Sequence, residues 1–365
     1  MTIFNYNKFL TEQKGRALLS YLPSKVSNKP DFELFGNQLY ANYLPRALNE
    51  LGYMVDYIDW QDTNYDPYAM NYDLFIGHGG YNFKQMAQRI NKRFCKTIFF
   101  STGFYWREFN RLEQERFDAL YQRRGVRLQP DRQITTDEES ALQLADGIIT
   151  LGNNVTAASY SDFRNVYAIG GMTAQRGQDL AGKDYKAGRK HFLFYSGDGS
   201  VHKGLDLLIE AFTGTDLHLH VCISKPDMLS MMGIYPEEEL SINYYGNIDI
   251  HGSLFEKLTK QCDWVISATC CEGCPSAVLE CMAHGLIPIL TGNASLTDYS
   301  SIKPCKYGAI LNQNIMDIRT SINNIADTSI DECRELSKCS QITAQTYYSP
   351  AAFSLRLKEA IEAIL

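Results

Sequence analysis

Short apolar runs of strand length alternate with helical patterns along most of the chain. Residues 264–268 form one such run, a helical pattern over 277–284 follows, and a second apolar run occupies 286–290. A strand, a helix and a second strand in this order form a βαβ unit, in which the two strands are parallel. Repeated units of this kind predict parallel sheets that helices cover on both faces. The sequence therefore indicates an α/β fold.

A glycine-rich stretch divides the alternation into two series. Residues 171–190 contain few large apolar side chains, which is typical of a linker, although a surface loop within one domain is the alternative. The length of 365 residues also favours two domains. We expect a Rossmann-like N-terminal domain over 1–170, a linker over 171–190 and a Rossmann-like C-terminal domain over 191–345. A last helix within 346–365 is expected to pack back on the N-terminal domain.

Composition argues against several classes of function. The net charge of −7 disfavours a general nucleic-acid-binding protein. No apolar run reaches transmembrane length, and the first residues lack the pattern of a signal peptide. Ten cysteines without a secretory signal predict reduced thiols, so we expect a cytoplasmic protein.

A modest group of basic residues in the N-terminal half is a candidate for weak contact with the inner face of a membrane. An ordinary solvated face is the alternative reading of the same charges. The group consists of Lys84, Arg89, Lys92, Arg93 and Lys96.

A glycine-rich loop at 197–204 follows the strand-like run at 191–195. Its backbone N–H groups and the ammonium group of Lys203 could cradle a phosphate. The loop is not a Walker A motif, because Leu205 stands where that motif requires a lysine. Beyond it, apolar residues recur at the spacing of one helix face, at Leu205, Leu208, Ile209 and Phe212.

Two carboxylates flank a second loop, which lies between the run at 264–268 and the helical pattern at 277–284. Glu272 sits in the loop, and Glu280 lies about one turn into the helix. The loop lies at the carboxyl end of a strand and opens a helix, which is the usual place for a nucleotide phosphate. The two carboxylates could hold different parts of one elongated, hydroxyl-rich ligand.

Two motifs carry a resemblance to a known family. Lys203 and Gly204, with the helical pattern after them, form a Lys-Gly signature. The stretch Glu272-Gly273-x-Pro275-x4-Glu280 forms an E-x7-E motif, which Leu279-Glu280-x-Met282-Ala283-x-Gly285-x-x-Pro288-Ile289 continues. Both motifs resemble those of glycosyltransferase family 4, the group 1 transferases. The resemblance covers residues 191–300 and is limited to general layout over 1–170.

The resemblance implies a GT-B fold, in which two Rossmann-like domains with parallel sheets face each other across a cleft. Glu272 would contact hydroxyls of the donor sugar, Glu280 would hold the ribose hydroxyls, and Lys203 would neutralise the leaving diphosphate. Backbone N–H groups at the start of the helix would meet the diphosphate, and the residues after 244 would seat the base. The implied donor-binding residues are Gly197, Gly273, Cys274, Ser276, Ala277, Val278, Glu280, Tyr245 and Ile248.

One position departs from the family pattern, and one N-terminal residue completes the implied catalytic set. The family commonly carries arginine directly after the loop glycine, where this chain has Asp198. We expect Asp198 to point away, with the diphosphate held by Lys203 and another cation or by backbone groups. His78 ends an N-terminal strand and is a candidate to position the acceptor or to contact the donor sugar, although a structural role is the equal alternative.

The cysteines near the second loop invite a metal interpretation, which we reject at the level of sequence. Cys270, Cys271, Cys274 and Cys281 are close in sequence, but no second C-x-x-C pair accompanies them. We expect these residues to pack as small apolar side chains. The sequence therefore predicts no metal and no cofactor.

The resemblance implies a retaining glycosyltransferase, for which polysaccharide biosynthesis is the expected setting. The donor would be a nucleotide-diphosphate sugar, and a UDP-sugar is expected because such donors are the most frequent. The acceptor would be a hydroxyl group of a saccharide or lipid-linked saccharide. Two alternatives are a catalytically inactive nucleotide-sugar-binding protein with the same fold and a sugar-nucleotide epimerase. The sugar, the acceptor, the linkage and the oligomeric state stay open.

Overall fold

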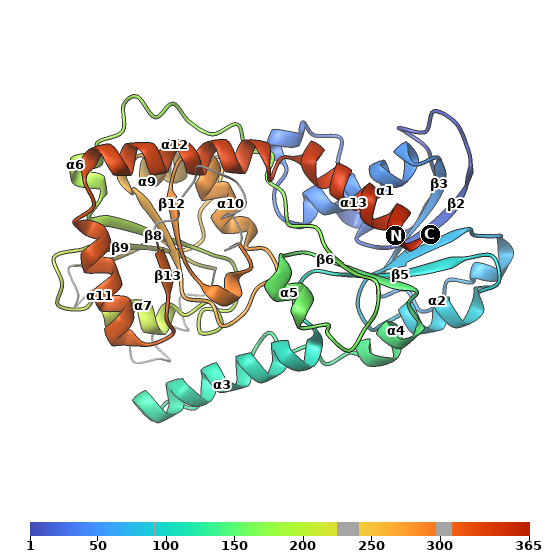
Figure 1. Cartoon of the computed structure of the whole chain (residues 1–365), viewed down its shortest axis with the longest axis horizontal. Helices are drawn as coiled ribbons and strands as arrows, with labels where there is room; N and C mark the ends of the chain where they lie inside the picture. Colours follow the sequence, from blue (N-terminus) through green and yellow to red (C-terminus); the bar gives the residue numbers. More distant parts are fainter. Residues whose placement is uncertain (91, 225–240, 297–308) are drawn as a thin grey trace. The chain divides into compact units, whose positions relative to one another are not determined.

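The computed structural model describes residues 1–90, 92–224, 241–296 and 309–365, and the chain within it divides into two compact units (Figure 1). The first unit comprises Met1–Trp106, Ile134–Ala174 and Ser349–Leu365. The second unit comprises Arg107–Gln133 and Gln175–Tyr348. Each unit is built on its own sheet, which is mostly parallel in the first unit and parallel in the second. The strand–helix alternation predicts sheets of this kind.

The first unit contains a seven-stranded sheet among its described residues, in the order β1-β3-β2-β4-β5-β6-β7. Only β1 is antiparallel to its neighbour. The strands are β1 Ile3–Tyr6, β2 Gly15–Tyr21, β3 Tyr53–Asp59, β4 Leu74–Gly77, β5 Lys96–Ser101, β6 Gly147–Thr150 and β7 Val166–Ala168. The helices are α1 Asn37–Glu50, α2 Phe83–Arg89, α4 Glu138–Leu144, α5 Asn154–Ala158 and α13 Pro350–Ile364, with 3-10 turns η1 Pro23–Lys25, η2 Asp31–Glu33 and η3 Pro67–Ala69.

The C-terminal helix α13 packs on α1 within this unit. The ring of Phe353 meets the ring of Tyr40 edge to face, with centroids 5.5 Å apart. Lys358 Nζ lies 2.8 Å from Glu50 Oε2. Apolar burial and this ion pair therefore hold the last helix against a helix some 300 residues earlier in sequence.

The second unit contains a six-stranded parallel sheet among its described residues, in the order β10-β9-β8-β11-β12-β13. Its strands are β8 His191–Tyr195, β9 His218–Cys222, β10 Ile242–Tyr244, β11 Trp264–Ser267, β12 Ile287–Thr291 and β13 Ala309–Leu311. Its helices are α3 Trp106–Arg124, α6 Tyr185–Gly188, α7 Leu205–Phe212, α9 Ser253–Gln261, α10 Ser276–Ala283, α11 Ile315–Ala326 and α12 Ile330–Thr346, with the 3-10 turn η5 Gly292–Ala294.

Helices cover both faces of this sheet (Figure 1). Successive side chains of a strand point to opposite faces, so the core has one part on each face of the sheet. Trp264 and Ile266 point to one face of β11, where they pack with the buried side of α7. Phe117 and Leu120 of α3 join the same cluster. Helix α3 is therefore part of the second unit's core, although strands of the first unit precede and follow it in sequence.

Helices that could cross a membrane are absent from the described residues. The basic group at 84–96 lies in the first unit, where two of its members have local partners. Lys84 lies 3.3 Å from Asp137, and Lys92 donates a hydrogen bond to the carbonyl of Leu144. Membrane contact through this group stays a prediction.

Candidate active site

Two loops meet where the strand order of the second unit reverses. From β8 the chain proceeds to β9 on one side, whereas β11 lies on the other side of β8. The loop after β8 and the loop after β11 therefore leave the same edge of the sheet next to each other. Ligands of open α/β sheets bind in the crevice at such a reversal, outside the carboxyl ends of the strands.

Gly204 allows the two loops to touch. Its φ of +78° is in the left-handed region, and a Cβ at this position would lie 2.2 Å from the carbonyl oxygen of Ala268. Any other residue would both strain the backbone and displace the loop after β11. Glycine here brings the preceding residue, Lys203, up to the loop that carries Glu272.

Lys203 and Glu272 form an ion pair across the two loops. The Nζ of Lys203 donates to Oε1 of Glu272, and the two side chains are 12% and 19% exposed. The second carboxylate oxygen of Glu272 is buried and has no hydrogen-bond partner within the described part of the chain. This oxygen is placed to accept a hydrogen bond from a bound ligand.

The charges around Glu272 keep it ionised. Burial acts to raise the pKa of its carboxyl, but the Lys203 ammonium opposes this effect and, with Arg132 and His202, holds the pKa below its usual range. A carboxylate that stays ionised at neutral pH can accept hydrogen bonds but cannot donate one. The site therefore suits hydroxyl donors at this oxygen.

Helix α10 begins directly beside this pair without a side-chain cap. Its first residues, Ser276 and Ala277, are half-buried, and their N–H groups precede any acceptor within the helix. The N–H of Val278 already donates to the Pro275 carbonyl at 3.0 Å. The positive end of the helix dipole and two N–H groups thus face the start of the loop, which favours an anion.

The remaining residues of the expected donor set lie in the same unit. Glu280 is buried on α10, Gly273 and Cys274 are buried in the loop before it, and Gly197 is exposed in the loop after β8. Tyr245 follows β10, where its hydroxyl lies 3.0 Å from His220 Nδ1. Ile248 is half-buried three residues further on.

Arg132 is a second cation at this site, and the sequence reasoning missed it. A Cβ on Gly199 would lie 2.4 Å from Arg132 Cδ, so the arginine chain runs directly over the loop after β8. Arg132 Nη1 lies 3.5 Å from the carbonyl oxygen of Asp198, which is itself exposed. No motif or spacing links residue 132 to this loop, so only the tertiary structure reveals their proximity.

His78 belongs to the first unit. Its Nδ1 donates to the Phe100 carbonyl at 2.9 Å, and its ring packs against Tyr21 and Trp60. Burial lowers the pKa of the imidazole. The ring is therefore neutral near pH 7, with Nε2 left as the acceptor nitrogen.

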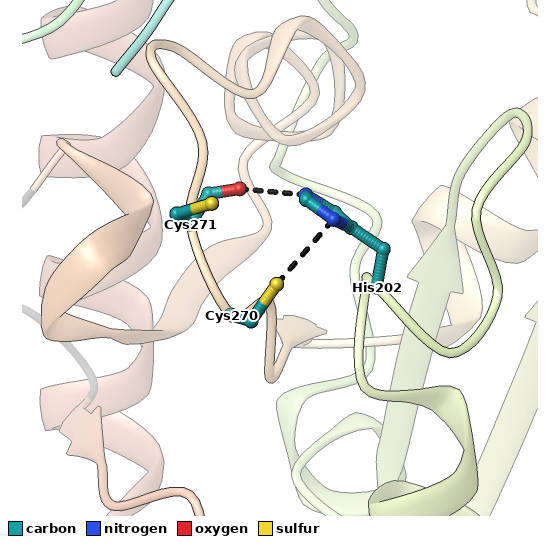
Figure 2. Close-up of side chains that lie close together, drawn as sticks. All are labelled: His202, Cys270 and Cys271. Carbon is teal, nitrogen blue, oxygen red and sulfur yellow. Dashed lines mark hydrogen bonds between the residues drawn. The ribbon is translucent and has the colours of Figure 1, made fainter. Parts of the chain in front are cut away.

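The residues just before Lys203 and Glu272 in sequence contribute to a buried cluster of His202, Cys270 and Cys271 (Figure 2). The Nε2 of His202 donates to the carbonyl of Cys271 at 2.8 Å, and its Nδ1 lies 3.3 Å from the sulfur of Cys270. A hydrogen bond with the Cys271 thiol lowers the pKa of Cys270 against the effect of burial, and His202 acts in the same direction. Cys274 and Cys281 are not members of this cluster.

Comparisons with known proteins find the same fold at low sequence identity. No protein-family model and no curated protein sequence matches the chain. Among solved structures, the sucrose-phosphate synthase from Thermosynechococcus elongatus matches with a TM-score of 0.61 at 15% identity over 95% of this chain and 98% of its own. Anabaena HepE in complex with UDP and glucose matches with a TM-score of 0.52 at 12% identity over 96% of this chain and 100% of its own.

A third structure, TarM, has a TM-score of 0.56 at 15% identity over 80% of this chain. This chain spans only 54% of the TarM chain. All three are glycosyltransferase structures of the GT-B type, so the comparisons confirm the expected α/β fold with two parallel-sheet domains. At these identities the likeness establishes the fold and not the activity.

Proposed function

We propose that this protein is a retaining glycosyltransferase that moves a sugar from a nucleotide-diphosphate sugar to a hydroxyl of a saccharide acceptor. The observation that carries the proposal is the Lys203–Glu272 pair beside the uncapped start of α10, with one Glu272 oxygen left without a partner. The fold supports the proposal through HepE, solved with UDP and glucose, and through S. aureus TarM, solved with UDP and α-GlcNAc-glycerol.

The donor would bind along the edge of the second unit's sheet. Its diphosphate would lie against Lys203 and the N–H groups of Ser276 and Ala277, because a cation and a helix N-terminus both stabilise phosphate charge. Glu272 would then accept a hydrogen bond from a sugar hydroxyl, and Glu280 would hold the ribose. Tyr245 and Ile248, with Gly197, Gly273, Cys274 and Val278 shaping the loops, would complete the nucleotide site.

Arg132 would supply the second positive charge that the loop after β8 lacks. The family to which the motifs bear a resemblance has arginine at the position of Asp198, whereas this chain places an arginine from another segment over the same loop. Two cations on one diphosphate stabilise the leaving group more than a single cation does. This arrangement would let the enzyme release the diphosphate without a metal ion bound to it.

Catalysis would rest on the charge that develops on the leaving diphosphate. Lys203, Arg132 and the α10 dipole would stabilise this charge as the glycosidic bond breaks. Retention of configuration would follow from attack on the same face, with a donor phosphate oxygen accepting the proton of the acceptor hydroxyl. His78 would contribute from the first unit as a hydrogen-bonding group for the acceptor or the donor sugar.

The test combines a donor screen with variants of the ion pair. Thermal shift with UDP, GDP, ADP and their sugars should identify one nucleotide that raises the Tm, and that nucleotide sugar should support transfer of a labelled sugar to oligosaccharides. Lys203→Ala and Glu272→Gln should each lower kcat/KM by about 10²-fold or more. Lys190→Ala, which removes an exposed lysine paired with Asp216 in the same unit, is the matched control. Full activity in either site variant would overturn the site assignment.

A second candidate is a nucleotide-sugar-binding protein without catalytic activity. The exposed carboxylate of Asp198 favours it, because a negative charge beside a diphosphate weakens leaving-group stabilisation. Such a protein would show the same thermal shift with its nucleotide sugar but neither transfer nor hydrolysis of the donor.

A further inference from the structure

The buried cluster of His202, Cys270 and Cys271 offers three side chains that could hold a metal ion (Figure 2). A ring nitrogen of His202 and the sulfurs of Cys270 and Cys271 all lie within 4.8 Å of one another. Each of these residues is at most 1% exposed. A tetrahedral zinc ion with bonds of about 2.0 to 2.3 Å holds its ligands roughly 3.5 to 3.8 Å apart. The His202–Cys270 distance of 3.3 Å is close to that requirement.

A candidate fourth ligand lies on α3, outside the group of three residues whose ligand atoms lie within 4.8 Å of one another. Glu113 is fully buried, and its Oε1 lies 3.5 Å from Nδ1 of His202. Its other oxygen, Oε2, is buried and lacks a hydrogen-bond partner among the described residues. A buried carboxylate oxygen without a partner is costly, and a cation at the centre of the cluster would remove that cost.

The histidine is already oriented for metal binding. A carbonyl oxygen can only accept, so the 2.8 Å contact with the Cys271 carbonyl places a proton on Nε2 of His202. The other ring nitrogen, Nδ1, lies 3.3 Å from the sulfur of Cys270 and 3.5 Å from Oε1 of Glu113, and a metal ion there would take the place of a proton on Nδ1. Metal-binding histidines are usually held in this way, by a hydrogen bond from the other ring nitrogen to a carbonyl or carboxylate.

The charge of the surroundings matches a divalent cation. Two thiolates and one carboxylate around a divalent ion leave a single negative charge. The guanidinium group of Arg116, which is buried and donates to the Ala268 carbonyl beside the cluster, balances this charge. The Cys271 thiol would give up its hydrogen bond with Cys270 and a weak contact of 4.0 Å with the Phe109 carbonyl.

We propose that Glu113, His202, Cys270 and Cys271 form a structural site for a soft divalent cation of the zinc class. Two sulfurs, one imidazole and one carboxylate disfavour magnesium or calcium, which prefer oxygen ligands. Four protein ligands leave no open position, which is typical of structural zinc. The buried ion would enter during folding and join α3 to the two loops of the candidate active site.

The site has a direct consequence for the ion pair above it. His202 precedes Lys203, and Cys271 precedes Glu272. An ion that joins His202 to Cys271 therefore sets the spacing of Lys203 and Glu272. The proposal does not depend on glycosyl transfer, and it replaces the expectation of no metal, which considered Cys274 and Cys281 rather than His202 and Glu113.

The experiment measures metal content of the full chain rather than activity. The protein is produced in medium with added Zn²⁺, purified under reducing conditions without chelator, and measured by inductively coupled plasma mass spectrometry. We expect about one zinc ion per chain. Production with Co²⁺ instead should give sulfur-to-cobalt charge-transfer absorption in the near ultraviolet and the visible bands of tetrahedral cobalt.

Variants separate this site from other cysteines. Cys270→Ser, Cys271→Ser and Glu113→Gln should each lower metal content by about tenfold or more, and circular dichroism verifies that each variant folds. Cys274→Ser and Cys281→Ser lie near the same loop and should retain the metal. Wild-type protein without zinc and without a cobalt spectrum would overturn the proposal. So would zinc that persists in a Cys270→Ser, Cys271→Ser double variant, which would identify an adventitious ion only.

Discussion

Lys203 and Glu272 neutralise each other across the two loops. A half-buried ammonium and a half-buried carboxylate are costly when alone, so each stabilises the other until a ligand arrives. A donor with an anionic diphosphate and a hydroxyl-rich sugar offers a better partner to both groups at once. One carboxylate oxygen of Glu272 has no hydrogen-bond partner among the described residues, so this single atom can accept a hydrogen bond from the ligand.

The proposed role of Arg132 predicts a loss of catalysis without a loss of fold. Arg132 is exposed, so Arg132→Ala should leave the Tm nearly unchanged. It should lower kcat by about tenfold to 10²-fold and weaken binding of the nucleoside diphosphate, because one charge on the leaving group is lost. Arg132→Lys should recover part of the activity. Steady-state kinetics and calorimetric titration measure both effects, and an unchanged kcat in Arg132→Ala would exclude the role.

Glu138 predicts a dependence of stability on pH in the first unit. Burial raises the pKa of its carboxyl to about 7, whereas in the unfolded chain the value is about 4.3. Between these values the folded protein binds more protons than the unfolded chain, so the free energy of unfolding falls as pH rises through this window.

Glu138→Gln removes this titration. The variant should be more stable than the wild type by about 3 to 4 kcal/mol at pH 8 and nearly equal to it at pH 4. Urea unfolding at a series of pH values measures the difference, with Glu359→Gln on the exposed side of α13 as the control. A difference that does not change with pH would contradict the assignment.

At the scale of elements, α10 illustrates a helix whose start is left for a ligand. Pro275 cannot cap it with a side chain, whereas Asn314, Ser329 and Ser349 cap the starts of α11, α12 and α13. The start of α10 also lies at the reversal of strand order beside Lys203. The missing cap lowers the stability of the protein slightly. An anion bound at the start of α10 would restore this stability.

This arrangement predicts opposite effects on stability and on binding. Ser276→Asp places a negative charge at the first residue of α10, where it should raise the free energy of unfolding by about 0.5 kcal/mol through the helix dipole. The same charge should weaken binding of the nucleoside diphosphate by about tenfold or more, since it occupies the anion's place. Ser253→Asp at the first residue of α9 is the matched control and should affect stability only. Equal binding by both variants would exclude α10 as the diphosphate site.

At the scale of the whole molecule, the two units exchange segments along the chain. Residues 107–133 belong to the second unit, and the last residues from Ser349 belong to the first. Arg123 of α3 pairs with the fully buried carboxylate of Asp206 and also lies 3.2 Å from Glu210. The segment that contributes Arg132 and Glu113 is thereby tied to the second unit.

Arg123→Ala should destabilise the second unit. The variant leaves the Asp206 carboxylate buried without its cation, which should cost about 3 kcal/mol. Arg111→Ala on the same helix removes exposed pairs with Glu108 and Glu115 and should cost about 0.5 kcal/mol or less. Differential scanning calorimetry of both variants provides the comparison, and equal melting curves would show that α3 does not support this unit.

Local patterns in the sequence were sufficient for the architecture. The spacing of Leu205, Leu208 and Phe212 predicted α7, and all three are buried in the structure. The run at 264–268 corresponds to β11, and the helical pattern after it corresponds to α10 within one residue. These features depend on periodicities of two and 3.6 residues, which short stretches of sequence contain in full.

The sequence by itself determined the α/β fold class and the motifs around Lys203 and Glu272, because both are local in the chain. Only the tertiary structure decided which distant residues join them. Arg132 and Glu113 reach the site from α3 and the segment after it, some 70 to 160 residues earlier in the chain, and His202 meets Cys270 across 68 residues. Packing of whole elements sets such proximities, and no spacing pattern in one sequence encodes them.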